Sequence, residues 1–426
     1  MKNTIPPVKG TRDFYPEQMA VRTWLYETVR LVSESFGYQE WEAPLLETID
    51  LYAAKSGDEL VNQQSFVFPD RDGDMITLRP ELTPSLARMV AQRQNQLVFP
   101  LRWWSFGPFW RYERPQRGRT REFFQWNIDL IGVDSPEADA EMIAIAAAFL
   151  KQARLSPLEA VILVNDRKLT GARLEALGIP PEERAKALGL IDRRQKMQPA
   201  DWEKDALDLG LSAKQLDGME SFLGDPDLWK QSETLVRVFA ALDALGVQDY
   251  VRYDSNIIRG LLYYTSTVFE AFDMTGAVRR AILGGGRYDN LMAQVGGDPL
   301  PAVGFAMGDV VVGLMLESLG RLPAGAERSP ADILVTVFDA DRQPASMKLA
   351  AQLRAAGLKV LCSAEPGKLP KQFKFADRMG MKAVLVIGPD EAAAGKVTVK
   401  DLKDGTQETI ASEGVPEAVK KILESH

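Results

Sequence analysis

The chain has 426 residues, a formal net charge of −8 and 46% hydrophobic residues, a composition typical of a soluble globular protein with two or three domains. Its single cysteine (Cys362) excludes an internal disulfide, and its single histidine (His426) leaves too few ligands for a Cys/His zinc site. The chemistry is therefore expected to depend on carboxylates, arginines, lysines, tyrosines or the backbone. Neither a signal peptide nor a run of about 18 apolar residues is evident, which predicts a cytoplasmic protein without a membrane span.

The first region of the chain, residues 1–165, is predicted to mix helices with short strands. Apolar residues at helical spacing begin the region, and Thr83 is expected to cap a helix whose first residue is Pro84. An alanine-rich stretch predicts a further helix. The predicted helices lie over residues 16–36, 83–94 and 136–152, and the predicted strands over 65–68, 75–78, 102–112 and 123–131.

The rest of the chain changes pattern twice. Residues 166–245 are charged and rich in leucine and alanine at helical spacing, which predicts a helical insertion. Strand-like sequence with many glycines then resumes, ends in a helix near 310–319, and is followed by a predicted linker over 321–330. From residue 331 strands and helices alternate, which predicts an α/β domain.

Residues 109–125 carry the strongest chemical pattern, with five arginines at positions 111–121 between aromatic residues. Two strands joined by such a loop are expected to bind a polyphosphate, because guanidinium groups contact phosphate oxygens in pairs. The alternation of side chains along a strand places Phe123 and Gln125 on one face, where Phe123 can lie under a base. A solvated hairpin tip is the alternative, and the neighbouring aromatic and acidic residues favour the phosphate site.

Two later stretches are also rich in groups that bind ligands. Arg259 precedes a glycine at the start of a strand and can reach a phosphate, while Tyr263 and Tyr264 supply hydroxyl groups, although paired tyrosines are common in packed cores. Glycines over 284–286 and 302–308 suggest backbone that approaches a ligand, although turns and bulges also need glycine. The patterns of a Rossmann or a P-loop nucleotide site are missing.

Several of these segments, in the same order, resemble the histidyl-tRNA synthetases, a family of class II aminoacyl-tRNA synthetases. The resemblance implies an α+β fold: an antiparallel sheet of six or seven strands with flanking helices, a helical insertion and a C-terminal α/β anticodon-binding domain, in a homodimer. It places the catalytic domain in residues 1–165 and 246–322, the insertion in 166–245 and the anticodon-binding domain in 331–426. The segments that carry it are residues 7–13, 79–83, 109–125, 259–265, 284–289, 371–377, 384–388 and 395–401.

The resemblance also implies an activity and a set of site residues. The activity is that of a histidine–tRNA ligase, which uses ATP and Mg²⁺ to convert L-histidine to histidyl-adenylate and transfers it to tRNA(His), with no metal ligand from the protein. The implied catalytic residues are Arg111 and Arg259, both on the α-phosphate of ATP. The other implied ATP-binding residues are Glu113, Arg121 and Phe123, and the implied histidine-binding residues are Glu81, Thr83, Gln125, Asp129, Tyr263 and Tyr264.

Three positions depart from the family pattern. Val311 stands where motif 3 carries an arginine that packs on adenine, Leu262 stands in place of an aspartate, and Ser266 in place of a frequent glycine. A valine supplies neither a cation–π contact nor a charge for phosphate. An alternative function therefore remains, that of a paralogue that charges no tRNA and serves as regulatory subunit of ATP phosphoribosyltransferase. The C-terminal domain argues against it, because such paralogues generally lack an anticodon-binding domain.

Overall fold

The computed structural model describes residues 4–53, 64–260, 263–322 and 329–425. The described residues fall into two compact units, the first within Met1–Asp13 and Val21–Pro323 and the second within Phe14–Ala20 and Ala324–His426. Leu262 and residues 323–328 of the predicted linker lie outside the described residues. Among the described residues, no helix combines the length and apolar character needed to cross a membrane.

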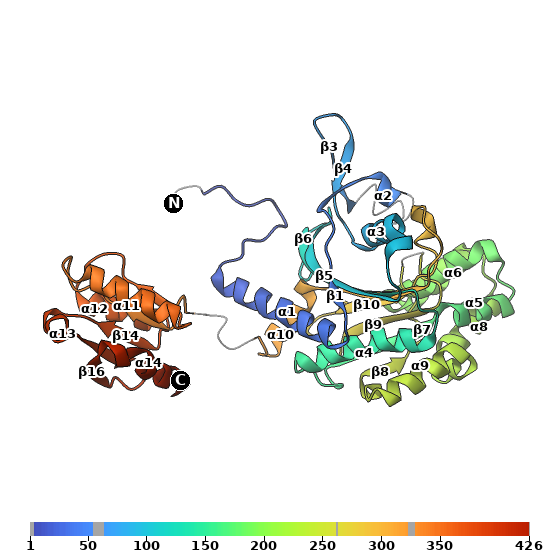
Figure 1. Ribbon diagram of the computed structural model, residues 1–426. Helices are drawn as coiled ribbons and strands as arrows, with labels where there is room; N and C mark the ends of the chain where they lie inside the picture. Colours follow the sequence, from blue (N-terminus) through green and yellow to red (C-terminus); the bar gives the residue numbers. More distant parts are fainter. Residues whose placement is uncertain (1–3, 54–63, 261–262, 323–328, 426) are drawn as a thin grey trace. The chain divides into compact units, whose positions relative to one another are not determined.

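The first unit is built around a sheet of eight strands in the order β1-β5-β6-β11-β10-β9-β7-β8 (Figure 1). The six central strands pair antiparallel, whereas the short edge strands β1 and β8 run parallel to β5 and β7. The α+β class is thus confirmed, with two parallel edge strands added to the expected antiparallel sheet. The strands are Gln39–Glu40 (β1), Leu101–Trp110 (β5), Glu122–Ile131 (β6), Ala160–Asp166 (β7), Val251–Tyr253 (β8), Thr267–Asp273 (β9), Leu283–Arg287 (β10) and Ala302–Gly308 (β11).

Helices α1 (Pro16–Ser35), α4 (Pro136–Gln152) and α10 (Asp309–Ser318) flank this sheet. Helix α4 begins where the sequence predicts, because Ser135 caps it by accepting a hydrogen bond from the Ala138 amide and Pro136 opens its first turn. Its apolar residues form one core with the sheet, where the ring of Trp126 lies 5.6 Å from Phe149 of α4 and 4.8 Å from Phe305 of β11. Burial of these aromatic side chains fixes the helix against the strands.

A smaller three-stranded sheet, in the order β2-β4-β3, lies beside helices α2 and α3 (Figure 1). The prediction that Thr83 caps α3 is wrong: Thr83 is the first helical residue, and Leu82 before it, already in a helical backbone conformation, offers no side-chain cap. The side chain of Thr83 therefore does not cap the helix. The bounds are Leu46–Thr48 (β2), Asp50–Ala53 (α2), Phe66–Pro69 (β3), Met75–Leu78 (β4) and Thr83–Arg93 (α3).

The segment predicted as a helical insertion consists of five α-helices with short 3₁₀ turns between them. Its buried leucines and Trp202 belong to the same hydrophobic core as the large sheet, and Arg237 of α9 pairs with Glu137 of α4. The segment is grouped with the first unit, so the three-domain division stays a prediction. The helices are Arg167–Ala176 (α5), Pro181–Arg193 (α6), Pro199–Asp208 (α7), Ala213–Leu223 (α8) and Glu233–Ala244 (α9).

The second unit has a five-stranded sheet in the order β13-β12-β14-β15-β16. Strand β12 pairs parallel with β13 and β14, as the alternation of strands and helices predicts. The pairs β14–β15 and β15–β16 are antiparallel. Strand β16 and helix α14 follow the last predicted strand. The bounds are Ile333–Val335 (β12), Gln343–Ala355 (α11), Val360–Cys362 (β13), Leu369–Arg378 (α12), Ala383–Val386 (β14), Pro389–Ala394 (α13), Lys396–Asp401 (β15), Gln407–Ala411 (β16) and Val415–Ser425 (α14).

Gly285 in the middle of β10 gives a test of this packing. A Cβ at this position would lie 2.7 Å from the Cα of Phe305 and would overlap the carbonyl oxygen of Gly304, so Gly285→Ala must displace β11. We expect a loss of about 1–3 kcal/mol, seen as a lower unfolding midpoint of the first unit. Gly313→Ala is the control, because a Cβ there meets open space, and it should leave stability unchanged or raise it by about 1 kcal/mol. Equal midpoints for the two variants would contradict the packing.

Candidate active site

A cavity of about 800 Å³ opens over the central strands of the first unit. Strands β6, β10 and β11 form its floor, and the start of α3, the loop between β5 and β6, the segment before β9 and the first turn of α10 form its walls. The cavity brings together ten of the eleven site residues selected from the sequence. These are Glu81, Thr83, Arg111, Glu113, Phe123, Gln125, Asp129, Arg259, Tyr263 and Tyr264.

Arg121, the eleventh predicted site residue, is not among the residues that line the cavity. Its Nε donates to the carbonyl oxygen of Glu113 at 3.2 Å, and its guanidinium lies 4.1 Å from the ring centroid of Tyr112. Arg119, two residues earlier in the same loop, lines the cavity and pairs with Glu113. The arginine-rich pattern therefore located the loop correctly but did not distinguish which of its arginines faces the cavity.

Arg111 and Arg259 place two cations in the cavity. Arg111 donates from Nε to the carbonyl oxygen of Pro80 at 2.9 Å, and burial lowers its pKa. Burial acts in the same direction on Arg259, but neighbouring Tyr264 and the carboxylate of Glu270, 2.5 Å from Nη1, outweigh it and raise its pKa. The Nε of Arg259 is buried and has no hydrogen-bond partner among the described residues. An acidic ligand in the cavity would supply one.

Asp129 and three tyrosines form the other end of the cavity. The Tyr288 hydroxyl donates a hydrogen bond to Asp129, and the ring of Tyr263 lies 4.8 Å from Tyr264 and 6.0 Å from Tyr288. Burial raises the pKa of Asp129 to about 7, although the hydrogen bond from Tyr288 works against this. Tyr288 was not selected from the sequence. Its place in the segment 284–289, two residues after the glycines and within the resemblance to the family, was the available signal.

Phe123 and Val311 line the cavity away from Asp129. The ring of Phe123 stacks on Phe109 with centroids 5.9 Å apart, and the Arg111 guanidinium lies 5.3 Å from its centroid. Val311 belongs to the first turn of α10, is 9% exposed and presents an apolar surface to the cavity. The position that departs from the family pattern thus lies in the cavity itself.

Glycines of the floor leave room for the charged groups above them. A Cβ at Gly284 would overlap the guanidinium of Arg259, and one at Gly304 would overlap the carboxylate of Asp129. The glycine-rich strands were interpreted as backbone that approaches a ligand. Both glycines do line the cavity, but their lack of a side chain first accommodates the protein's own charged residues.

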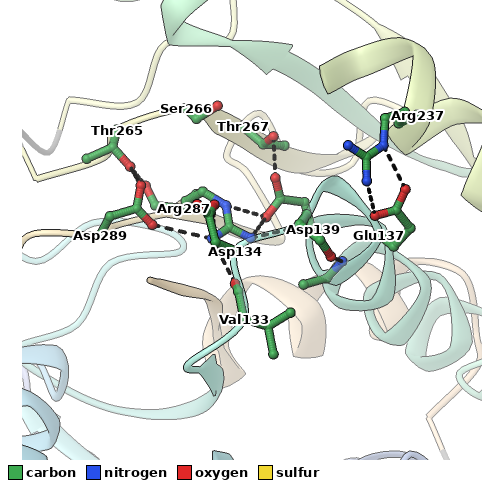
Figure 2. A network of polar contacts seen from close by, with 12 residues as sticks. Val133, Asp134, Glu137, Asp139, Arg237, Thr265, Ser266, Thr267, Arg287 and Asp289 are labelled. Carbon is green, nitrogen blue, oxygen red and sulfur yellow. Dashed lines mark hydrogen bonds and ion pairs between the residues drawn. The ribbon is translucent and has the colours of Figure 1, made fainter. Parts of the chain in front are cut away.

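A buried polar network joins Arg287, Asp139 and Thr267 (Figure 2). Arg287 donates from Nε to Asp139 at 2.8 Å and from Nη1 to the carbonyl oxygen of Val133 at 3.1 Å. Thr267 donates to the second oxygen of Asp139 at 2.6 Å, and Thr265 donates to Asp289 at 2.6 Å. The network therefore ties the segment after Tyr264 and the end of β10 to the start of α4, which fixes Tyr264 and Tyr288 in place.

Comparisons with known proteins identify the same family over nearly all of the chain. The model of the histidyl-tRNA synthetase family matches residues 10–309, and that of an anticodon-binding domain matches residues 332–422. The chain is similar to the histidine–tRNA ligases of Opitutus terrae (37% identity, 98% of this chain and 98% of that one) and Thermoplasma volcanium (39%, 95% and 96%). Its structure is similar to that of histidyl-tRNA synthetase from Nostoc sp. PCC 7120, with a TM-score of 0.83 and 28% identity over 99% of this chain and 100% of that one.

The chain belongs to the histidyl-tRNA synthetase family. The predicted class II fold, the anticodon-binding domain and the function of a histidine–tRNA ligase that uses ATP are confirmed. The presence of the anticodon-binding domain counts against the regulatory alternative. The individual site residues stay predictions.

Asp129 is a buried carboxyl group in the lining of the cavity, and the pH dependence of stability should reveal the cost of its ionisation. Because the pKa of Asp129 rises from 3.8 to about 7 on folding, its ionisation opposes folding: the penalty is absent below pH 4, grows between pH 4 and 7 and is complete above pH 7. Asp129→Asn, whose amide oxygen still accepts from Tyr288, should therefore stabilise the protein at pH 8 by on the order of 4 kcal/mol.

The measurement is the thermal midpoint of both proteins from pH 5 to pH 8. The advantage of Asp129→Asn should grow with pH across this range. An advantage that does not change with pH would show that the carboxyl group does not titrate in this window.

Proposed function

We propose that the cavity binds ATP and histidine side by side and that Arg111 and Arg259 hold the α-phosphate between them. An oxygen of the histidine carboxylate attacks the α-phosphorus, a P–O bond to histidine forms, and the P–O bond to pyrophosphate breaks. The pair of cationic residues, brought to one cavity from distant segments, is the observation that carries this assignment. Positioning and charge stabilisation suffice for such a step, so the lack of a catalytic cysteine or histidine in the cavity lining is no obstacle.

The nucleotide end of the cavity is assigned to Phe123 and the loop between β5 and β6. Phe123, supported from behind by Phe109, offers a flat face for adenine. Glu113 is held by Arg119, which orients both side chains at the loop, and either can contact ATP. Arg121 stays a predicted ATP contact. Its present contacts with Glu113 and Tyr112 require it to reorient if it is to reach the nucleotide.

The histidine end is assigned to Asp129, Tyr263, Tyr264 and Tyr288. A carboxylate and tyrosine hydroxyls can satisfy both ring nitrogens of an imidazole, and an analogue that leaves them unpaired is rejected by a factor of roughly 10⁴. The α-amino group of the substrate is assigned to polar side chains at the start of α3 and on β6. These are Glu81, Thr83 and Gln125, all in the cavity lining.

Mg²⁺ is proposed to enter with ATP. Phosphate oxygens are its expected ligands, because Glu81 is assigned to the α-amino group and Glu113 is paired with Arg119. Among the described residues, no cluster of three or more possible metal ligands occurs. When bound, the ion supplies positive charge to the phosphates.

The second unit is proposed to bind the anticodon stem of tRNA(His). Exposed basic residues lie along helix α12 and at the residue before it. They can contact a phosphate backbone. They are Lys368, Lys371, Lys374 and Arg378. Activation in the first unit and anticodon recognition in the second would together select the amino acid and its tRNA. A cytoplasmic location is likewise proposed from the sequence.

Histidine-dependent exchange between ATP and pyrophosphate tests the assignment of the site. The purified protein, assayed with each of the twenty amino acids, should exchange with histidine alone. Arg259→Ala should lower kcat by about 100- to 1,000-fold, since a lost charge contact to the transition state costs about 3–4 kcal/mol. Arg252→Ala is the matched control, because Arg252 is exposed on β8 and does not line the cavity. Full activity of Arg259→Ala would overturn the catalytic role of Arg259.

The homodimer implied by the family resemblance is proposed as the active form. The chain has a mass of 47.2 kDa, so light scattering after size-exclusion chromatography should give about twice that mass for the ligase. A mass of a single chain at the concentration of the exchange assay, with activity retained, would contradict the dimer.

A further inference from the structure

One wall of the cavity lacks the cation that the family pattern places there. Val310 and Val311, in the first turn of α10, line the cavity and carry no charge. A class II synthetase nevertheless has to stabilise negative charge that moves onto the leaving pyrophosphate. Another cation near this wall is therefore worth identifying.

Arg280 lies at this wall, on the connection between β9 and β10. It lines the cavity, and its Nη1 donates to the carbonyl oxygen of Gly118, in the loop between β5 and β6, at 3.2 Å. A Cβ built on Gly118 would lie 3.7 Å from Cδ of Arg280 and 3.9 Å from Cδ1 of Leu314. Both side chains thus approach the same glycine. Because Leu314 and Val311 are three residues apart on α10, they share a face of that helix.

The charge balance of the cavity also points to Arg280, which shares with Arg111 the lack of a carboxylate partner among the described residues. Arg119 pairs with Glu113, and Arg259 pairs with Glu270. In the part of the chain that the structure describes, Arg280 has no carboxylate partner, and its hydrogen bond goes to a backbone carbonyl. The positive charge of Arg280 repels that of Arg111 and, together with burial, lowers the pKa of Arg111. An anion bound between Arg111 and Arg280 would relieve this repulsion.

We infer that Arg280 binds the phosphates of ATP that leave as pyrophosphate, and that it supplies from the β9–β10 connection the charge that Val311 lacks. The inference rests on the proposed function, which places ATP in this cavity. Arg111 holds the α-phosphate, and Arg280 stabilises the β- and γ-phosphates beyond it. As the P–O bond breaks, the electron pair moves onto pyrophosphate, and the guanidinium of Arg280 can donate hydrogen bonds to two pyrophosphate oxygens.

The neighbouring residue Arg279 makes a matched control possible. Arg279 has the same side chain in the same connection but is exposed and does not line the cavity. The experiment compares Arg280→Ala and Arg279→Ala with the unaltered protein in histidine-dependent exchange, and measures binding of ATP and of AMP by calorimetry. Arg280→Ala should raise the KM and Kd for ATP by about 10- to 100-fold, the effect of one hydrogen bond between charged groups. It should leave the Kd for AMP and the KM for histidine unchanged.

Two further variants separate binding from folding. Arg280→Lys should recover part of the ATP affinity, because it keeps the charge but not the two-pronged contact. Val311→Arg in the Arg280→Ala protein should restore part of the affinity by returning a cation to the same wall.

The outcomes separate the two proposals. Exchange by the unaltered protein with equal constants for Arg280→Ala and Arg279→Ala would overturn the role of Arg280 and leave the proposed function standing. Equal weakening of ATP and AMP binding would also overturn it, because the contact would then not be to the leaving phosphates. Loss of exchange in the unaltered, folded protein would overturn the proposed function, and the assignment of Arg280 with it.

Discussion

Charged side chains of the cavity need space that only glycine can leave. The guanidinium of Arg259 occupies the position of a Cβ on Gly284, and the carboxylate of Asp129 does the same above Gly304. Both glycines belong to central strands, where a residue without a side chain ordinarily weakens a sheet. The sheet is stabilised instead by the large apolar core on the α4 side. The site's electrostatics therefore depend on two missing side chains, and any other residue at either position would displace a charge from the cavity.

Each buried charge above the floor then requires a partner, because an isolated charge in an apolar environment is costly. Glu270 accompanies Arg259, and Tyr288 accompanies Asp129. Arg287 joins Asp139 and holds the end of β10 to the start of α4 (Figure 2). A buried ion pair contributes little net stability but enforces one geometry. In this protein that geometry is the position of the tyrosines around the proposed imidazole pocket.

The departures from the family pattern acquire a physical interpretation from these contacts. Val311 removes a cation from the wall of the cavity, and Arg280 reaches the same wall from another strand connection. Ser266, where glycine is frequent, donates to Asp166, and Asp166 also accepts from Ser232 at the start of α9. The substitution thus links the segment after Tyr264 to the helical segment between β7 and β8.

Local sequence patterns determined most of the helices and strands, since periodicity and capping residues act over a few residues. Helix α4 begins and ends where the alanine-rich sequence predicts, whereas Thr83 failed as a cap because Leu82 was already helical. Motifs long enough to be specific identified the family, and ten of the eleven residues predicted from them line the cavity. Only the tertiary structure decided which arginine of the loop faces the cavity and that Arg280, from a segment without a motif, joins it. The direction of a side chain in a loop depends on contacts between segments far apart in the sequence, and no local pattern encodes those contacts.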